Sequence, residues 1–164
     1  LVVAGVESLG LFAADHALAG KAAGVDYVDR NPGRRSIAEG LGARVFEALD
    51  PGFERQYPVV IGASREPADL RGAILALAPG GHFSNVAIHF GDTPMPLWEM
   101  YLRDVTFSIG VPSVNAHIPS VLNLARCGHI HPERLARVID WRDACEALLE
   151  PDLKPVVIRP RLLA

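Results

Sequence analysis

Short apolar runs alternate with amphipathic stretches along most of this chain. Strands are predicted at residues 1–5 ("LVVAG"), 25–29 ("VDYVD"), 43–47 ("ARVFE"), 57–63 ("YPVVIGA"), 81–88 ("GHFSNVAI") and 104–110 ("DVTFSIG"). Helices are predicted between them, at residues 8–18, 32–41, 67–77 and 94–102. Strands that alternate with helices in this way are typical of a parallel sheet covered by helices. We therefore predict an α/β fold of the Rossmann type, with a doubly wound, six-stranded parallel sheet.

Proline and glycine mark the ends of the predicted helices. Pro32 suits the first turn of a helix, where its missing N–H costs nothing. The stretch "APGG" (78–81) is predicted to end the third helix, with Gly80 and Gly81 free to adopt the left-handed conformation there. These signals support the division of the chain into strand–helix units.

The pattern changes after Gly110. A helix is predicted at about 117–127, followed by a polar turn, a helix at 141–150 and a last strand at 154–160. We therefore divide the chain into a nucleotide-binding domain, residues 1–128, and a short helix–strand appendage, residues 129–164.

Composition and charge exclude several classes of function. The chain has 164 residues, of which 49% are hydrophobic and 21% charged, the balance of a globular protein. A net charge of −3 gives no reason to expect a nucleic-acid or membrane-surface partner. Two cysteines form no disulfide framework, so a reducing, cytoplasmic setting is expected. Cys127, His129 and His131 alternate, but Gly128 and Pro132 favour a turn there, and no metal site is predicted.

The first strand, the turn after it and the following helix have the order that suits a bound pyrophosphate. A helix N-terminus offers unpaired N–H groups and a partial positive charge, and glycines let the backbone approach the phosphates. Gly5 and Gly10 occupy the first and third positions of G-x-G-x-x-G, but Glu7 occupies the second. Asp29 ends the second predicted strand, where a carboxylate can accept hydrogen bonds from the adenosine ribose.

The preference between NAD and NADP depends on the charges around Asp29. Its carboxylate would repel a 2′-phosphate, which favours NAD. Arg30, Arg34 and Arg35 weaken that preference, because arginines beside this position can pair with the extra phosphate. The sequence therefore predicts NAD and leaves NADP open.

With these features in place, the chain resembles the coenzyme-binding domain of the medium-chain dehydrogenase/reductase superfamily, of the zinc-containing alcohol dehydrogenase type. The resemblance rests on "LVVAGVESLGLFAADHA", "VDYVDRNPGRRSIAEGLGA", "PVVIGASREPADLRGAILALAPGGHFSNVAI", "LRDVTFSIG" and "WRDACEAL…KPVVIRP", in the family's order. It implies the strand order 3-2-1-4-5-6 and a homodimer joined along the sixth strand, or a tetramer made of two such dimers.

The resemblance also implies cofactor contacts and a missing part. Ser8 and Leu9 would offer backbone N–H groups to the pyrophosphate, and Asp29 would hold the adenosine ribose. The remaining implied contacts are Arg34 beside the adenine, Ala63 and Ser64 on the adenine side of the cleft, and Val86, Ile88, Ile109 and Val111 around the nicotinamide. In the family a catalytic domain, which carries any zinc, precedes the strand that begins at Leu1. We therefore expect this chain to be part of a larger dehydrogenase and to be inactive alone.

The implied reaction is hydride transfer between a nicotinamide and a small alcohol or carbonyl substrate. Glu7 is the main departure from the family, because a carboxylate close to a diphosphate is unfavourable unless it meets a cation or faces solvent. Two alternative functions also agree with this pattern: a zinc-free quinone or enoyl reductase, and a nucleotide-binding module without catalysis. An S-adenosylmethionine-dependent methyltransferase shares the glycine turn and the acidic residue, but it has no place for the C-terminal segment.

Overall fold

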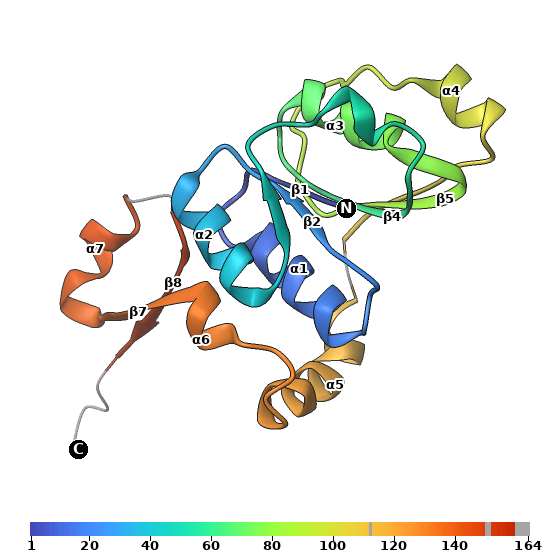
Figure 1. Cartoon of the computed structure of the whole chain (residues 1–164). Helices are drawn as coiled ribbons and strands as arrows, with labels where there is room; N and C mark the ends of the chain where they lie inside the picture. The colour runs from blue at the N-terminus through green and yellow to red at the C-terminus, as the bar shows by residue number, and fades with distance from the viewer. Residues whose placement is uncertain (112, 150–151, 160–164) are drawn as a thin grey trace.

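The computed structural model describes residues 1–111, 113–149 and 152–159 (Figure 1). Six strands form one parallel sheet in the order β3-β2-β1-β4-β5-β6, and two more form a separate parallel pair, β7-β8. The predicted fold class and strand order are therefore confirmed. None of the helices in the described ranges is long and apolar enough to span a membrane.

The elements follow one another as strand–helix units through β6. The strands are β1 (Val2–Ala4), β2 (Asp26–Val28), β3 (Arg44–Phe46), β4 (Tyr57–Ala63), β5 (Leu77–Asn85), β6 (Thr106–Ile109), β7 (Ala136–Asp140) and β8 (Lys154–Ile158). The α-helices are α1 (Leu9–Ala19), α2 (Pro32–Leu41), α3 (Pro67–Leu75), α4 (Leu97–Leu102), α5 (Val114–Arg126), α6 (Pro132–Leu135) and α7 (Ala144–Ala147). Two single turns of 3₁₀ helix, η1 (Pro51–Phe53) and η2 (Trp141–Asp143), complete the chain.

The core lies on both faces of the six-stranded sheet. Successive side chains of a strand point to opposite faces, so Val2 packs with α1 and α2 whereas Val3 packs with α3. On the first face Leu11 and Tyr27 are fully buried, and on the second Phe83 is. Figure 1 shows α1 and α2 on one side of the sheet and α3 on the other. β1, buried on both faces, is thus the centre of the domain.

The fifth strand begins and ends earlier than the sequence pattern indicates. α3 ends at Leu75, and β5 runs from Leu77 to Asn85. Gly80 has a positive φ of 72°, but it lies within β5, where its N–H donates to the carbonyl of Arg103 at 2.7 Å. The prediction that Gly80 and Gly81 end the helix is therefore wrong. Gly80 instead allows an irregularity in the strand, where the register between β4 and β5 shifts.

The C-terminal part contains a strand that the pattern did not predict. Residues 127–131 form the expected polar turn, and the residues after it form α6 and then β7, which pairs in parallel with β8. The helix expected at 141–150 is the short η2 and α7, with residue 150 outside the described residues. His131 fastens this part to α1, because its backbone N–H and its Nδ1 lie 2.6 and 3.0 Å from the carboxylate oxygens of Asp15.

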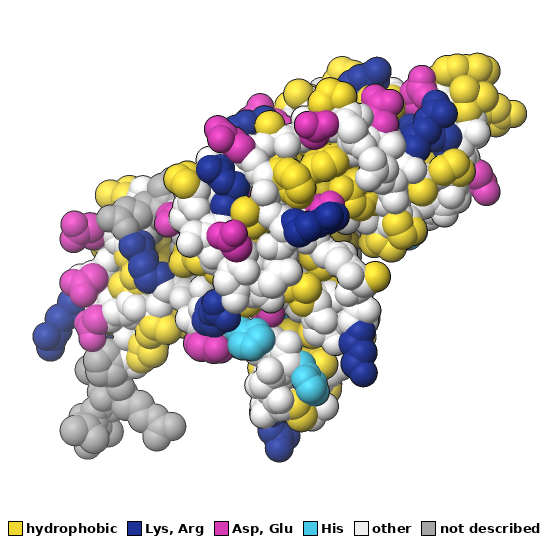
Figure 2. All heavy atoms as spheres, viewed as in Figure 1, with side chains coloured by type: hydrophobic (Ala, Val, Ile, Leu, Met, Phe, Trp, Pro, Cys, Tyr) yellow, Lys and Arg dark blue, Asp and Glu magenta, His cyan; other side chains and the backbone are white. Residues whose placement is uncertain are grey.

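Helix α4 buries none of its residues. Trp98 and Tyr101 stack with their ring centroids 6.1 Å apart, and their exposed neighbours include Leu97 and Leu102. Figure 2 shows hydrophobic atoms gathered at this end of the molecule. The patch lies away from the carboxyl ends of β1, β2 and β4.

Candidate cofactor site

The carboxyl ends of β1 and β4 meet where the strand order reverses, the point at which open α/β sheets bind ligands. A cavity of about 310 Å³ opens there. Its walls come from segments that follow β1, β2 and β4, and are Ala4, Gly5, Val6, Glu7, Asp29, Arg30, Arg34, Ser64, Arg65 and Glu66. The fold thus brings six of the predicted site residues to one cavity: Gly5, Glu7, Asp29, Arg30, Arg34 and Ser64.

Both glycines of the turn lie where a side chain does not fit. A β-carbon on Gly5 would lie 2.9 Å from Oγ of Ser64, at the end of β4. A β-carbon on Gly10 would lie 2.4 Å from Cβ of Ala4, so α1 packs directly on β1. Gly5 therefore lines the cavity, whereas Gly10 lets the helix approach the strand.

Glu7 occupies the middle of the turn with a positive φ of 38°, a conformation in which glycine is favoured. Its carboxylate lies 3.3 Å from the ammonium of Lys154 at the start of β8. The carboxylate that the sequence places beside a pyrophosphate therefore meets a cation. Lys154 was not among the predicted site residues.

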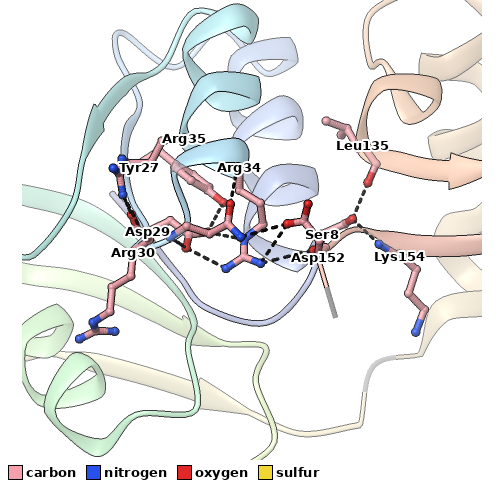
Figure 3. A network of polar contacts seen from close by, with 10 residues as sticks. Ser8, Tyr27, Asp29, Arg30, Arg34, Arg35, Leu135, Asp152 and Lys154 are labelled. Carbon is pink, nitrogen blue, oxygen red and sulfur yellow. Dashed lines mark hydrogen bonds and ion pairs between the residues drawn. The ribbon is translucent and has the colours of Figure 1, made fainter. Parts of the chain in front are cut away.

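Ser8 and Leu9 belong to the turn but not to the cavity wall. The Ser8 hydroxyl is buried, donates to the carbonyl of Leu135 and accepts from the backbone N–H of Lys154 at 2.8 Å (Figure 3). The N–H of Leu9 donates to the carbonyl of Val6 at 3.1 Å. The side chain of Ser8 thus joins the C-terminal segment to the turn, and the expected contacts of these two backbone N–H groups with pyrophosphate stay a prediction.

Asp29 lies at the other end of the cavity, and its side chain is 1% exposed. One carboxylate oxygen accepts from the Tyr27 hydroxyl at 2.9 Å and from Nε of Arg34 at 2.7 Å. The other accepts from the Asn31 N–H at 2.9 Å and from Nη2 of Arg34 at 2.8 Å (Figure 3). An ionised carboxylate has about four lone-pair sites. Ribose hydroxyls can therefore bind Asp29 only by exchange with one of these donors.

Arg34 keeps Asp29 ionised. Burial alone raises the pKa of the Asp29 carboxyl, but the hydrogen bonds from Arg34, Asn31 and Tyr27 outweigh it and lower that pKa below its ordinary value. The hydrogen bonds to Asp29 in turn raise the pKa of Arg34. Arg34 has further acceptors in Asp152, whose carbonyl lies 3.3 Å and whose carboxylate lies 3.7 Å from Nη1.

The other two arginines near Asp29 are also engaged within the chain. Arg30 forms a bidentate ion pair with Asp69, with both N–O distances at 2.8 Å. The Ser64 hydroxyl donates to the same Asp69 carboxylate at 2.7 Å. Arg35 donates to the carbonyls of Asp29 and Arg30, at 2.7 and 2.9 Å. Each arginine that was predicted to pair with a 2′-phosphate is therefore already bonded to a group of the chain itself.

The residues expected around the nicotinamide divide between two cavities. Val86, Ile109 and Val111 line a cavity of about 360 Å³ between the ends of β5 and β6. Ile88 lines a different cavity, of about 260 Å³, together with Arg65. The sequence places Val86 and Ile88 at the end of the fifth strand, which is wrong, because β5 ends at Asn85 and both follow it. Ala63 is fully buried at the end of β4 and is not part of the cavity wall.

Sequence reasoning missed Asp69, Asp152, Lys154 and Arg65. One signal was available for Asp69: an acidic residue in the first turn of a helix that begins at Pro67, at the end of a strand next to β1 in the sheet. No local signal marks Lys154 or Asp152, whose partners lie more than 100 positions earlier in the chain.

The described residues also fail to provide a metal site. Within residues 1–111, 113–149 and 152–159, no three His, Cys, Asp or Glu side chains gather where they would hold a metal ion. The residues described here therefore do not fit a catalytic zinc ion.

Solved structures similar to this chain include an alcohol dehydrogenase, TADH, from Thermus sp. ATN1, with a TM-score of 0.86 and 27% identity. That match covers 97% of this chain and 52% of the other. The chain shares its fold with alcohol dehydrogenases. The expected resemblance to alcohol dehydrogenases is thereby confirmed. No protein-family model matches the sequence, and no curated protein sequence is similar enough to count as a relative.

Two similar structures contain nicotinamide cofactors. A short chain alcohol dehydrogenase from Escherichia coli CFT073 is complexed with NADH (TM-score 0.80, 18% identity, 95% of this chain and 50% of the other). A zinc-binding dehydrogenase from Sinorhizobium meliloti 1021 is bound to NADP (TM-score 0.78, 19% identity, 96% and 51%). The present chain spans about half the length of each of these proteins.

Proposed function

We propose that this chain is the NAD-binding part of an alcohol dehydrogenase-like oxidoreductase. The observation that carries the proposal is the cavity that joins the glycine turn to Asp29 at the point where the strand order reverses. Gly5 leaves space for a ligand beside β4, and Lys154 compensates the charge of Glu7. A dinucleotide suits such a cavity, with its pyrophosphate at the turn and its adenosine at Asp29.

Three features of the chain support NAD over NADP. Asp29 is ionised and buried at the ribose end of the cavity, so a phosphate brought there meets a negative charge. Arg30 and Arg35 are engaged with Asp69 and with backbone carbonyls. Arg34 is bonded to Asp29 through two nitrogens and to the carbonyl of Asp152 through the third, so it too is engaged within the chain.

In the whole protein, the nicotinamide would supply the hydride acceptor or donor. The role of this chain is to bind and orient the nicotinamide cofactor. Asp29 would hold the adenosine end, and the apolar side chains of Val86 and Ile109 would form one wall at the nicotinamide end. The substrate is a small alcohol or carbonyl compound, and two copies of the chain pair along the edge strand β6. These assignments rest on the resemblance and on the cavity.

Binding of NADH and NADPH to the 164-residue chain tests the proposal. Titration followed by nicotinamide fluorescence gives a Kd for each, and ADP-ribose serves as a competitor for the same cavity. We expect NADH to bind about tenfold more tightly than NADPH, the size of one charge-assisted interaction. Absence of NADH binding at millimolar concentration, or tighter binding of NADPH, would contradict it.

A further inference from the structure

We propose that Asp69 decides which dinucleotide the cavity accepts, because it holds the Arg30 guanidinium away from the 2′ position of the ribose. This inference rests on the proposed function, and it assigns the selection to a residue on α3, forty positions from Asp29. Asp69 does not line the cavity. It acts through Arg30, which does.

The geometry makes Asp69 the fixed partner and Arg30 the movable one. The Asp69 side chain is 11% exposed, and the Ser64 hydroxyl holds its carboxylate at 2.7 Å. The Arg30 side chain is 61% exposed and reaches Asp69 with two parallel N–H···O bonds of 2.8 Å. A pair of this fork-to-fork type is among the strongest side-chain interactions and fixes the plane of the guanidinium. Arg30 is therefore held across the cavity toward α3.

The other arginines of the cavity wall, Arg34 and Arg65, are not placed to pair with a 2′-phosphate. Arg34 is 8% exposed and is bonded through two nitrogens to Asp29. The guanidinium of Arg65 lies over the ring of Phe90, 6.0 Å from its centroid. Arg30 follows directly after Asp29, so it is the cation that could reach a group on the ribose bound there.

A 2′-phosphate would have to displace Asp69 from Arg30. That exchange would leave the Asp69 carboxylate with the single Ser64 bond in a site that is almost closed to water. It would also bring a second anion close to it, and both effects oppose the exchange. If Asp69 carried no charge, Arg30 would be free to turn to the phosphate with its full charge and its two terminal nitrogens.

The test is a cycle of Asp69→Asn, Arg30→Met and the double variant in the 164-residue chain. The probes are 5′-AMP and 2′,5′-ADP, which differ only in the 2′-phosphate, and calorimetry gives the Kd of each. Asparagine keeps the shape of Asp69 and an oxygen for Ser64. We expect Asp69→Asn to tighten 2′,5′-ADP about tenfold and to leave 5′-AMP nearly unchanged. Arg30→Met should abolish this gain in the double variant.

Glu66→Gln is the matched control, because it removes a charge of the same sign from the cavity wall and leaves both hydrogen bonds between Arg30 and Asp69 in place. A gain equal to that of Asp69→Asn in this control would overturn the inference, since the effect would then be one of general charge. An unchanged preference in Asp69→Asn, or a gain that survives Arg30→Met, would also overturn it. None of these three outcomes would contradict the proposed function, provided that the wild-type chain binds NADH. Loss of NADH binding by the wild-type chain would overturn both.

Discussion

Replacing Arg34 by methionine removes one half of a buried ion pair and keeps most of the side-chain volume. The side chain of Arg34 is 8% exposed and that of Asp29 is 1% exposed. Arg34→Met deletes two of the four hydrogen bonds that the Asp29 carboxylate accepts, at 2.7 and 2.8 Å. Tyr27 and Asn31 remain as donors. Asp29 is then a buried anion without a cation.

The expected loss is a large part of the stability of the domain. Breaking a buried ion pair on one side costs about 3–5 kcal/mol. Since two donors still hold Asp29, we expect a loss near the lower limit, about 3 kcal/mol. A domain of this size has an unfolding free energy of about 5–15 kcal/mol. The variant should therefore fold, but with a clearly lower urea midpoint.

Urea unfolding followed by circular dichroism measures this loss. Arg71→Met is the control, because Arg71 is exposed on α3 and a surface substitution changes stability by about 0.5 kcal/mol or less. The double variant Arg34→Met/Asp29→Asn removes the uncompensated charge and should recover part of the loss. If Arg34→Met unfolds within 1 kcal/mol of the wild type, Tyr27 and Asn31 suffice for Asp29 and the reasoning from the ion pair fails.

Three further outcomes are expected. Gly10→Ala should lower the unfolding free energy by about 2 kcal/mol, because overpacking against Ala4 outweighs the better helix propensity of alanine; Gly24→Ala, with open space around it, is the control. Glu7→Gly and Glu7→Gln should both tighten NADH binding by removing a charge from the cavity, so an unchanged Kd in both variants would refute a role for that charge. Because the pKa of Asp29 is lowered on folding, its ion pair stabilises the protein above the carboxyl's ordinary pKa; this stability should fall as the pH drops through the lowered value, and the loss should be smaller in Asp29→Asn.

The strands of the sheet could be predicted because local patterns mark them, whereas their order was implied by the resemblance to a known family. The apolar runs that became β1 and β4 are read directly from residues such as Val2 and Val60, which are buried because helices cover both faces. The need for glycine at positions 5 and 10 could also be predicted, because at each of them the backbone approaches another element too closely for a side chain. Contacts of this kind depend on residues that are close in sequence or belong to neighbouring strands.

The parts that could not be predicted depend on distant residues. The pairing of β7 with β8 brings Ala136 opposite Lys154. The strand at β8 was predicted, but β7 was not, and no local pattern shows that the two segments pair. The partner of Arg30 was equally hidden, since Asp69 is 39 positions away and on another element. Asp29 itself was found by its spacing from Gly10, but the spacing says nothing about the four donors that saturate it.

The hydroxyl of Ser8 has a consequence for the order in which the protein is built. It joins the carbonyl of Leu135, 127 positions away, and the N–H of Lys154, 146 positions away. During synthesis, strands β1 to β6 exist before either partner has left the ribosome. A nascent chain can therefore assemble its sheet while the buried Ser8 hydroxyl still lacks both of these partners, and its two hydrogen bonds form only after Leu135 and Lys154 have emerged.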